Sequence, residues 1–312
     1  MELTVVLPIY NEAPSIPLLF EELERAVKDY DYEIIAVNDG SKDASWPELQ
    51  KMAAENARIK LLNFRRNYGQ TAALSAGIQA ASGEIIVLID SDLENDPKDI
   101  RLLVDKLNEG YDVVSGWRKG RWEGQFLTRK LPSLLANQLI SKIGGVPLHD
   151  YGCTLKAYRR DIVQDVKLYG QMHRFIPVFC KWQGGTVTEL PVSYRPRMFG
   201  QSNYGLFRIY KVILDLILIR FLEKFMTRPI HFFGGVGILS FLMSFFTFGV
   251  AGYFKLTGEK DFVETPLPIL SAMFFTVGVL MVLLGIISEI MMRTYFESQN
   301  SAPFSIRDRV NF

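Results

Sequence analysis

Short apolar runs alternate with helical patterns over the first 115 residues, and this alternation limits the possible folds more than any other feature. The runs are residues 3–7 (LTVVL), 32–37 (YEIIAV), 59–63, 84–89 and 111–115 (YDVVS), and the helical patterns are residues 15–30, 44–56, 69–81 and 97–108. Strands that alternate with helices of this length form βαβ units, which build a mostly parallel sheet covered by helices on both faces. We therefore predict an α/β domain over residues 1–204.

Polar and charged residues follow every predicted strand. They are PIYNE (8–12), NDGS (38–41), RRNYGQ (65–70), DSDLE (90–94) and SGWRKGR (115–121). Ligands of such sheets bind beyond the carboxyl ends of the strands. Any one of these segments is compatible with a solvated loop, but all five together predict a binding site at one edge of the sheet.

The fourth of these segments carries closely spaced carboxylates. Asp90 and Asp92 are two residues apart, so on an extended strand end both side chains can point to the same side. Carboxylates select a hard divalent cation, Mg²⁺ or Mn²⁺, which shares its coordination with phosphate oxygens. The chain has no HExxH and no Walker GxxxxGK[ST] motif, so basic side chains are the other phosphate-binding resource: Arg118, Lys119, Arg121, Arg129 and Lys130.

The remaining polar features are less decisive. Asp39 can accept hydrogen bonds from a nucleotide base or ribose, but NDGS is also a good β-turn sequence, and the two interpretations stay open. A net charge of +1 indicates no strong field for nucleic acid. Cys153 and Cys180 have no CxxC spacing, which favours two reduced core thiols, and we see no signal peptide at the N-terminus.

The composition changes after residue 205. Residues 206–226 have a helical period with several basic residues, which is typical of a helix lying in a membrane interface; a buried core helix is the alternative. Residues 230–254 and 267–292 are each longer than the ~20 apolar residues needed to cross a bilayer. Basic residues precede the first run and follow the second, so we expect residues 1–204, the juxtamembrane helix 205–229 and the tail 293–312 on the cytoplasmic side of an inner membrane.

Several motifs in this order resemble the family 2 glycosyltransferases of the GT-A fold. They are PIYNE, NDGS, the DSD acid pair, DYGCTLKAYRR (150–160) and RMFGQSNY (197–204). The sequence is most similar to the polyprenyl-phosphate branch, which includes dolichol-phosphate mannosyltransferases, bactoprenol glucosyltransferases and undecaprenyl-phosphate aminoarabinose transferases. The resemblance extends over nearly the whole chain, including both apolar segments.

The resemblance assigns roles to individual residues. It implies donor-nucleotide binding by Pro8, Tyr10, Glu12, Asp39, Asn67, Gly69, Gln70, Asp90 and Ser91. It implies metal binding by Asp90, Asp92 and Glu94, and acceptor-phosphate binding by Arg118, Arg129, Arg197 and Ser202. Asp150, with Arg118 and Arg129, matches the catalytic residues, and we expect Asp150 to orient a substrate more than to remove a proton. Glu94 stands where many relatives have Gln, and Asn203 where many have Lys.

The same resemblance implies an activity. We expect inverting, metal-dependent transfer from a nucleotide sugar, UDP-glucose or another UDP-hexose, to polyprenyl phosphate, and a homo-oligomer such as a tetramer. The sequence leaves open a modified arabinose or mannose donor and a non-lipid acceptor. A processive synthase is disfavoured because the chain has two predicted spans and no QxxRW motif. A scaffold without catalysis is disfavoured by the acid pair and the arginines.

Overall fold

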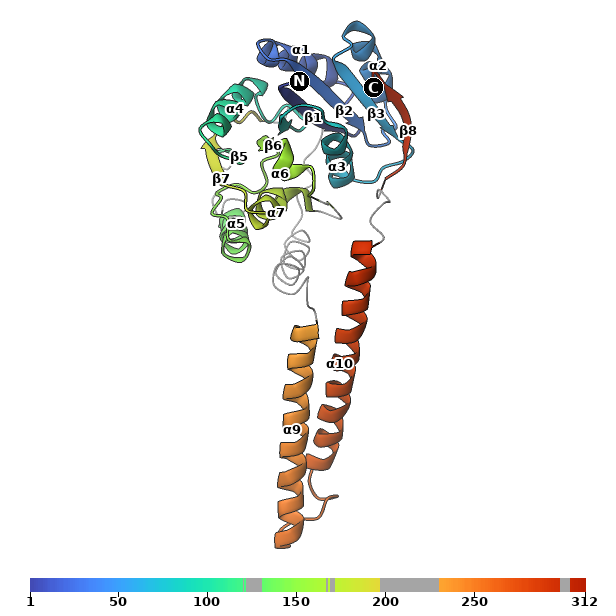
Figure 1. The fold of residues 1–312 in the computed structure, drawn as a ribbon, viewed down its shortest axis with the longest axis vertical. Coiled ribbons are helices and arrows are strands. Elements are labelled where there is room, and N and C mark those ends of the chain that lie inside the picture. The colour runs from blue at the N-terminus through green and yellow to red at the C-terminus, as the bar shows by residue number, and fades with distance from the viewer. Residues whose placement is uncertain (120, 122–130, 167, 169–171, 197–229, 298–303) are drawn as a thin grey trace. The chain divides into compact units, whose positions relative to one another are not determined.

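An eight-stranded sheet forms the centre of the N-terminal unit (Figure 1). The structure, a computed structural model, describes residues 1–119, 121, 131–166, 168, 172–196, 230–297 and 304–312. The strand order is β7-β5-β6-β4-β1-β2-β3-β8, and only β6 and β8 run antiparallel to their neighbours among the described strands. The strands are β1 (Leu3–Ile9), β2 (Tyr32–Asn38), β3 (Ile59–Phe64), β4 (Ile85–Leu88), β5 (Val113–Trp117), β6 (Lys156–Arg159), β7 (Val187–Pro191) and β8 (Ile306–Val310).

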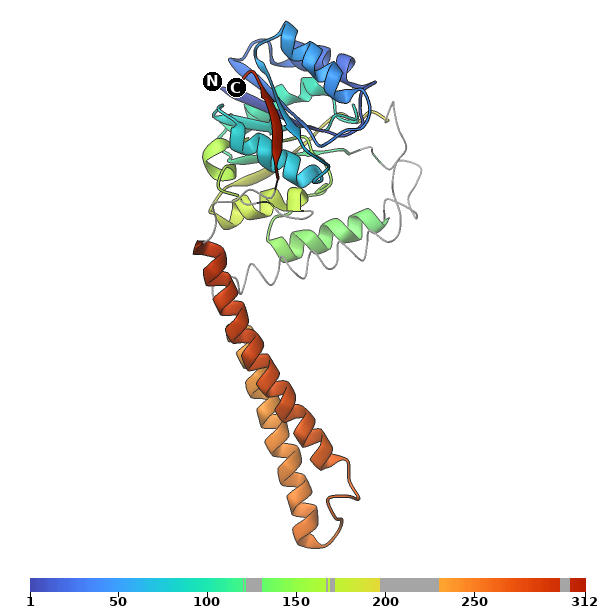
Figure 2. The same ribbon diagram turned by 90° about the vertical axis from the view of Figure 1, so that its right-hand side faces the viewer.

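Helices cover both faces of this sheet, as the alternating pattern predicts. Helices α1, α2 and α4 pack on one face, whereas α3, α6 and α7 pack on the other (Figure 2). Successive residues of β1 serve opposite layers: Val5 and Leu7 pack on the first face, and Val6 packs on the second. The helices are α1 (Ile16–Val27), α2 (Ser45–Glu55), α3 (Gln70–Ala80), α4 (Ile100–Asn108), α5 (Leu131–Gly144), α6 (Arg160–Val163) and α7 (Ile176–Trp182), with short 3₁₀ turns η1 (Pro97–Asp99) and η3 (Met172–Phe175).

The first helix illustrates why these segments fold as they do. Its buried side chains recur at helical spacing and form one apolar stripe: Ile16, Leu19, Phe20, Leu23 and Val27. Pro17 lies in the first turn, where its missing N–H costs nothing. Each large apolar side chain that is fully buried stabilises the fold by about 1.5–3 kcal/mol, so the stripe fixes α1 against the sheet.

The mostly parallel α/β sheet of a GT-A domain is confirmed, but it contains three strands that we did not predict. Strands β6 and β7 follow the last predicted strand. Strand β8 lies in the segment 293–312 that we expected to be a tail, and it pairs antiparallel with β3. Its sequence IRDRV carries three charged residues in five, so no local apolar pattern marks it as a strand.

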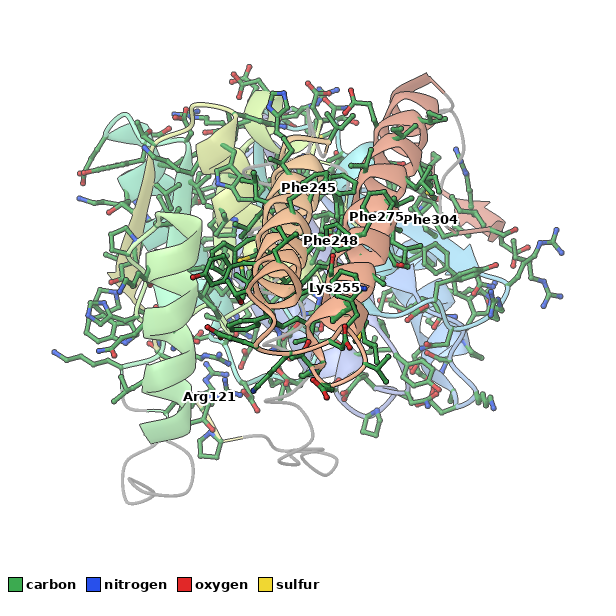
Figure 3. All side chains as sticks on the ribbon, turned by 90° about the horizontal axis from the view of Figure 1, so that it is seen from below. Arg121, Phe245, Phe248, Lys255, Phe275 and Phe304 are labelled. Atoms are coloured by element: carbon green, nitrogen blue, oxygen red, sulfur yellow. The ribbon has the colours of Figure 1, made fainter. Side chains whose placement is uncertain are left out.

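Two long helices, α9 (Ile230–Thr257) and α10 (Leu267–Glu297), form the second unit. Both are long and apolar enough to cross a membrane, and only 17% of the most apolar window of each is buried within the protein. Small buried residues, including Gly237 and Ser244, line the contact between them, and Ser244 Oγ lies 3.1 Å from Ser271 Oγ. Large side chains such as Phe245 and Phe248 are exposed along α9 (Figure 3). The predicted juxtamembrane helix 205–229 lies outside the described residues.

Candidate active site

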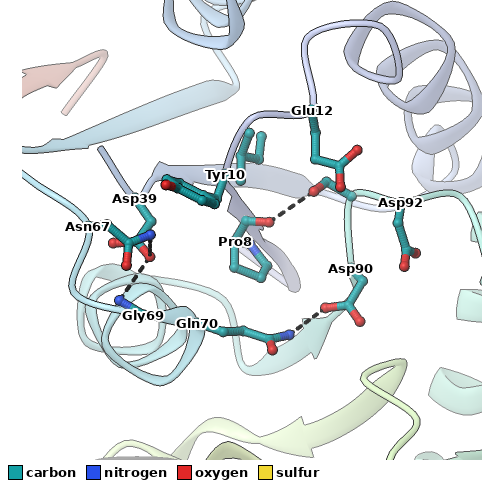
Figure 4. Close-up of a pocket in the computed structure, with 11 residues that line it drawn as sticks. Pro8, Tyr10, Glu12, Asp39, Asn67, Gly69, Gln70, Asp90 and Asp92 are labelled. Carbon is teal, nitrogen blue, oxygen red and sulfur yellow. Dashed lines mark hydrogen bonds between the residues drawn. The ribbon is translucent and has the colours of Figure 1, made fainter. Parts of the chain in front are cut away.

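A cavity of about 260 Å³ opens at the carboxyl ends of β1, β2 and β4 (Figure 4). Its lining contains all nine residues predicted to bind the donor nucleotide, together with Asp92 and Ile9. These residues come from four segments of the chain that are far apart in sequence. They meet because parallel strands end at the same edge of the sheet.

Asp39, the residue after β2, holds the loop that follows β3 by hydrogen bonds. Its carboxylate accepts hydrogen bonds from Gly69 N at 2.9 Å and Asn67 Nδ2 at 3.0 Å (Figure 4). It also accepts a hydrogen bond from Tyr68 N at 2.7 Å. The next residue, Gly40, has φ +65°, and a Cβ there would lie 2.4 Å from the carbonyl carbon of Arg66. The chain therefore turns sharply at Gly40, and Asp39 lines the cavity. Burial raises the pKa of Asp39 although these backbone N–H groups oppose the shift.

Asp90, just beyond β4, is held through both of its carboxylate oxygens. Gln70 Nε2 donates to Oδ1 at 2.7 Å, and Thr154 Oγ1 donates to Oδ2 at 2.7 Å. Burial, together with the nearby charge of Asp92, raises the pKa of Asp90 to about 6. Ser91 Oγ donates to the main-chain oxygen of Pro8 at 3.1 Å, which ties this turn to the end of β1.

The acid pair Asp90 and Asp92 fits a divalent cation. Both residues line the cavity, and the raised pKa of Asp90 indicates that two negative charges are costly here without a cation to offset them. The described residues contain no cluster of three or more His, Cys, Asp or Glu arranged to hold a metal. Mg²⁺ is usually bound by one or two carboxylates, with water and phosphate oxygens as its other ligands, so the pair Asp90 and Asp92 suits such an ion.

Glu94, predicted as a third metal ligand, has different partners in the structure. It does not line the cavity, and its Oε2 accepts hydrogen bonds from Arg121 Nη2 at 3.0 Å and Arg118 Nη1 at 3.3 Å. The buried residue before it, Leu93, has φ +60°, a strained conformation for a branched side chain. This left-handed turn lies between the two carboxylates and separates Asp92 at the cavity from Glu94 at the arginines.

Arg118 and Asp150 form the centre of a second polar group next to this turn. Arg118 donates to Asp150 from Nε at 2.8 Å and from Nη2 at 3.2 Å, and only 5% of Arg118 is exposed. Burial by itself would raise the pKa of Asp150, but the charge and hydrogen bonds of Arg118 outweigh burial and lower it. A carboxylate that is held ionised in this way is suited to orienting other groups.

Three predicted acceptor residues, Arg129, Arg197 and Ser202, lie outside the described residues. Conversely, sequence reasoning missed the contributions of Thr154 and Lys156. Thr154 lies in the DYGCTLKAYRR motif, but nothing in the sequence links its hydroxyl to Asp90, which is 64 positions away. Buried Lys156 donates to the main-chain oxygens of Tyr151 and Cys153, and burial lowers its pKa. These bonds hold the segment that carries both Asp150 and Thr154.

Comparison with known proteins identifies the family. The model of glycosyl transferase family 2 matches residues 4–167, which contain the sheet edge and both polar groups described above. The chain belongs to this family. It is therefore a glycosyltransferase. A relative, the dodecaprenyl-phosphate galacturonate synthase of Rhizobium johnstonii, is 40% identical over 316 aligned residues, which cover 98% of this chain and 92% of the relative.

Solved structures support the same fold for this family 2 glycosyltransferase. The glucosyl-3-phosphoglycerate synthase of Mycobacterium tuberculosis, in complex with Mn²⁺ and UDP-glucose, superposes with a TM-score of 0.56 at 18% identity. The match covers 71% of this chain and 78% of the mycobacterial chain. A second complex of that enzyme, with Mn²⁺, UDP and glucosyl-3-phosphoglycerate, gives the same TM-score of 0.56.

Proposed function

We propose that this enzyme transfers a hexose from a UDP-sugar to polyprenyl phosphate at the cytoplasmic face of a membrane. The observation that carries the proposal is the cavity in which Asp39, Asp90 and Asp92 meet beside the Arg118–Asp150 pair. The R. johnstonii relative, which makes dodecaprenyl-phosphate galacturonate, supports a lipid phosphate as the acceptor. The two apolar helices support a membrane location.

The cavity is suited to the nucleotide part of the donor. Asp39 and the loop residues Asn67 and Gly69 would contact the base and ribose, and the diphosphate would lie toward Asp90 and Asp92. A divalent metal held by Asp90 and Asp92 would supply positive charge to the diphosphate as it leaves. Gln70 and Thr154 orient Asp90 by their hydrogen bonds.

The acceptor phosphate supplies the attacking oxygen. This oxygen bonds to the anomeric carbon while the bond from that carbon to the nucleoside diphosphate breaks, so the anomeric configuration inverts. A phosphate monoester has a second pKa of about 6 and is already ionised near neutral pH, so the step needs little help from a general base. The work of the protein is then to position the two substrates, and we assign Asp150 to that task.

Arginines provide the acceptor side of the site. Glu94 holds the guanidinium groups of Arg118 and Arg121 beside Asp150, and we propose that these cations face the lipid phosphate. Arg129, Arg197 and Ser202 remain predictions for the same task. Basic residues on both flanks of the apolar pair support a catalytic domain and chain ends on the cytoplasmic side.

A donor panel tests the proposal. Purified full-length protein in lipid nanodiscs with undecaprenyl phosphate is incubated with Mn²⁺ and radiolabelled UDP-glucose, UDP-galacturonate, UDP-galactose or GDP-mannose. We expect label from one UDP-sugar to enter the organic phase, as a product that mild acid hydrolyses. Label that enters only a water-soluble or protein-bound product would contradict the lipid acceptor, and a preference for GDP-mannose would contradict the UDP-linked donor.

A further inference from the structure

The C-terminal strand β8 pairs with β3, which in turn pairs with β2, and Asp39 lies in the turn that follows β2. A row of side-chain hydrogen bonds connects β8 to this turn. Asn63 Nδ2, on β3, donates to Asp308 Oδ2, on β8, at 2.8 Å. Asn38 Nδ2, on β2, donates to Asn63 Oδ1 at 2.8 Å. Ser41 N then donates to Asn38 Oδ1 at 3.3 Å. The row therefore runs from Asp308 to both flanks of Asp39, because Asn38 precedes Asp39 and Ser41 follows it closely.

The two asparagines in this row are buried, with 2% of Asn38 and 7% of Asn63 exposed. A side-chain amide has one acceptor oxygen and one donor nitrogen that must both be satisfied when water is excluded. Asp308, as a carboxylate, offers only acceptors, so it fixes Asn63 with its nitrogen toward β8 and its oxygen toward Asn38. Because the oxygen of Asn63 accepts from the nitrogen of Asn38, the oxygen of Asn38 points toward the turn that carries Asp39.

A second set of contacts from the same segment reaches the other side of Asp39. The ring of Phe304 stacks on Phe64 at 5.2 Å between centroids, and Phe64 meets Tyr68 edge-on at 5.6 Å. Arg65 N donates to Ser305 O at 3.2 Å. Tyr68 N is one of the groups that donate to Asp39. The loop at residues 65–70, which binds the Asp39 carboxylate, and the end of β3 before it therefore contact Phe304 and Ser305, which follow α10 in the sequence.

We propose that Asp308 is a positioning residue of the donor site, acting through Asn63 and Asn38 on the turn that carries Asp39. The inference rests on the proposed function for its statement that this turn contacts the nucleotide. It assigns the strand after the second apolar helix to the donor half of the active site. Without Asp308, the Asn63 nitrogen lacks its acceptor and both amides can reorient, so the turn and the loop at residues 65–70 lose their fixed geometry.

The test compares Asp308→Ala with Asp308→Asn, whose amide oxygen can still accept from Asn63. Arg309→Ala is the matched control, because Arg309 is exposed on the same strand and lies opposite Leu62. With the full-length protein in nanodiscs, we measure the Kd for UDP with Mn²⁺ and the KM and kcat for donor. We expect Asp308→Ala to raise Kd and KM about fivefold with kcat within about twofold. Asp308→Asn and Arg309→Ala should stay within about twofold of the wild type.

Hydrogen–deuterium exchange of the ligand-free protein provides a readout that needs no nucleotide. We expect Asp308→Ala, but neither Asp308→Asn nor Arg309→Ala, to speed exchange in residues 38–41 and 65–70. Unchanged exchange there, equal behaviour of Asp308→Ala and Asp308→Asn, or a loss of folded protein with unchanged Kd would each overturn the inference. Faster exchange in a protein whose wild type binds no UDP would support the positioning role and contradict the proposed function instead.

Discussion

Arg118 donates two hydrogen bonds to the Asp150 carboxylate, from Nε at 2.8 Å and from Nη2 at 3.2 Å. Because this contact lowers the pKa of Asp150 below its usual value, the carboxylate is ionised throughout the neutral range. A group with that property orients its partners and has little tendency to take up a proton. The pair therefore accounts for a site in which positioning dominates over acid–base chemistry.

The first prediction concerns this pair. Asp150→Asn should lower kcat by about 10- to 100-fold, because Arg118 loses its charged partner and reacting groups that are misplaced by ~1 Å cost about a hundredfold in rate. The profile of kcat against pH between 5.5 and 8.5 should keep its shape. An acidic limb that is present in the wild type and absent from Asp150→Asn would show instead that Asp150 acts as a general base.

The second prediction concerns the hydrogen bond from Thr154 to Asp90. Thr154→Val removes the hydroxyl while keeping the side-chain shape, so Asp90 loses one of its two orienting donors. Loss of such a supporting contact typically weakens metal affinity about 10- to 100-fold. A Mn²⁺ titration of transfer activity measures this change. Thr154→Ser, which retains the hydroxyl, should stay within a few-fold of the wild type, and equal losses in both variants would contradict the assignment.

The third prediction separates Glu94 from the metal acids. Since Glu94 binds Arg118 and Arg121, Glu94→Gln should change the KM for polyprenyl phosphate while the Mn²⁺ requirement stays within about twofold. Asp92→Asn should raise the Mn²⁺ requirement by at least about 100-fold, more than the loss of a supporting contact does. Similar increases in the Mn²⁺ requirement of Glu94→Gln and Asp92→Asn would indicate that Glu94 is a metal ligand.

The sequence predicted the parts of this molecule that depend on local pattern. Each predicted strand from residues 3–7 to 111–115 has a counterpart within a few residues, because a strand that is buried on both faces is mostly apolar along its length. That the residues predicted to bind the donor line one cavity could also be anticipated, because parallel strands end at the same edge of the sheet. Asp39, Asp90 and Asp92 lie together for that reason.

The features that escaped prediction depend on distant contacts. β8 carries charged residues, so its local sequence does not predict a strand. It is a strand because it pairs with β3, more than 240 positions away in the sequence. Glu94 is two residues after Asp92, so on an extended strand both side chains would lie on the same face. The left-handed conformation of Leu93, between them, prevents this arrangement. A branched residue gives no sequence signal for a positive φ, so the change of direction could not be anticipated.

The fourth prediction concerns the buried ion pair between Glu33 and Lys60. Their charged atoms lie 2.6 Å apart, and the side chain of Glu33 is fully buried. Burial by itself would raise the pKa of Glu33, but hydrogen bonds from Lys60, Thr4 and Ser82 lower it below 4.5. A depressed pKa stabilises the fold above the unfolded-state pKa, and this stabilisation is lost as the pH falls through the folded-state value.

Glu33→Gln should therefore lower the free energy of unfolding by about 1–2 kcal/mol at pH 7. The difference from the wild type should stay constant down to about pH 5 and shrink below about pH 4.5. Thermal melts of the full-length protein at several pH values measure this difference. Glu48→Gln is the control, because Glu48 pairs with the exposed Lys51 on the surface, where ion pairs contribute little. A difference that grows at low pH would contradict the account.

The most direct test compares two acceptors that differ only in their phosphate. Full-length protein in nanodiscs, with Mn²⁺ and the labelled UDP-sugar that the donor panel selects, is given either undecaprenyl phosphate or undecaprenol. We predict that label enters the lipid only with undecaprenyl phosphate, and that Asp92→Asn loses most of this transfer at the Mn²⁺ concentration that just saturates the wild type. Equal labelling of undecaprenol, or full transfer by Asp92→Asn, would contradict the claim that this site joins a nucleotide sugar to a lipid phosphate.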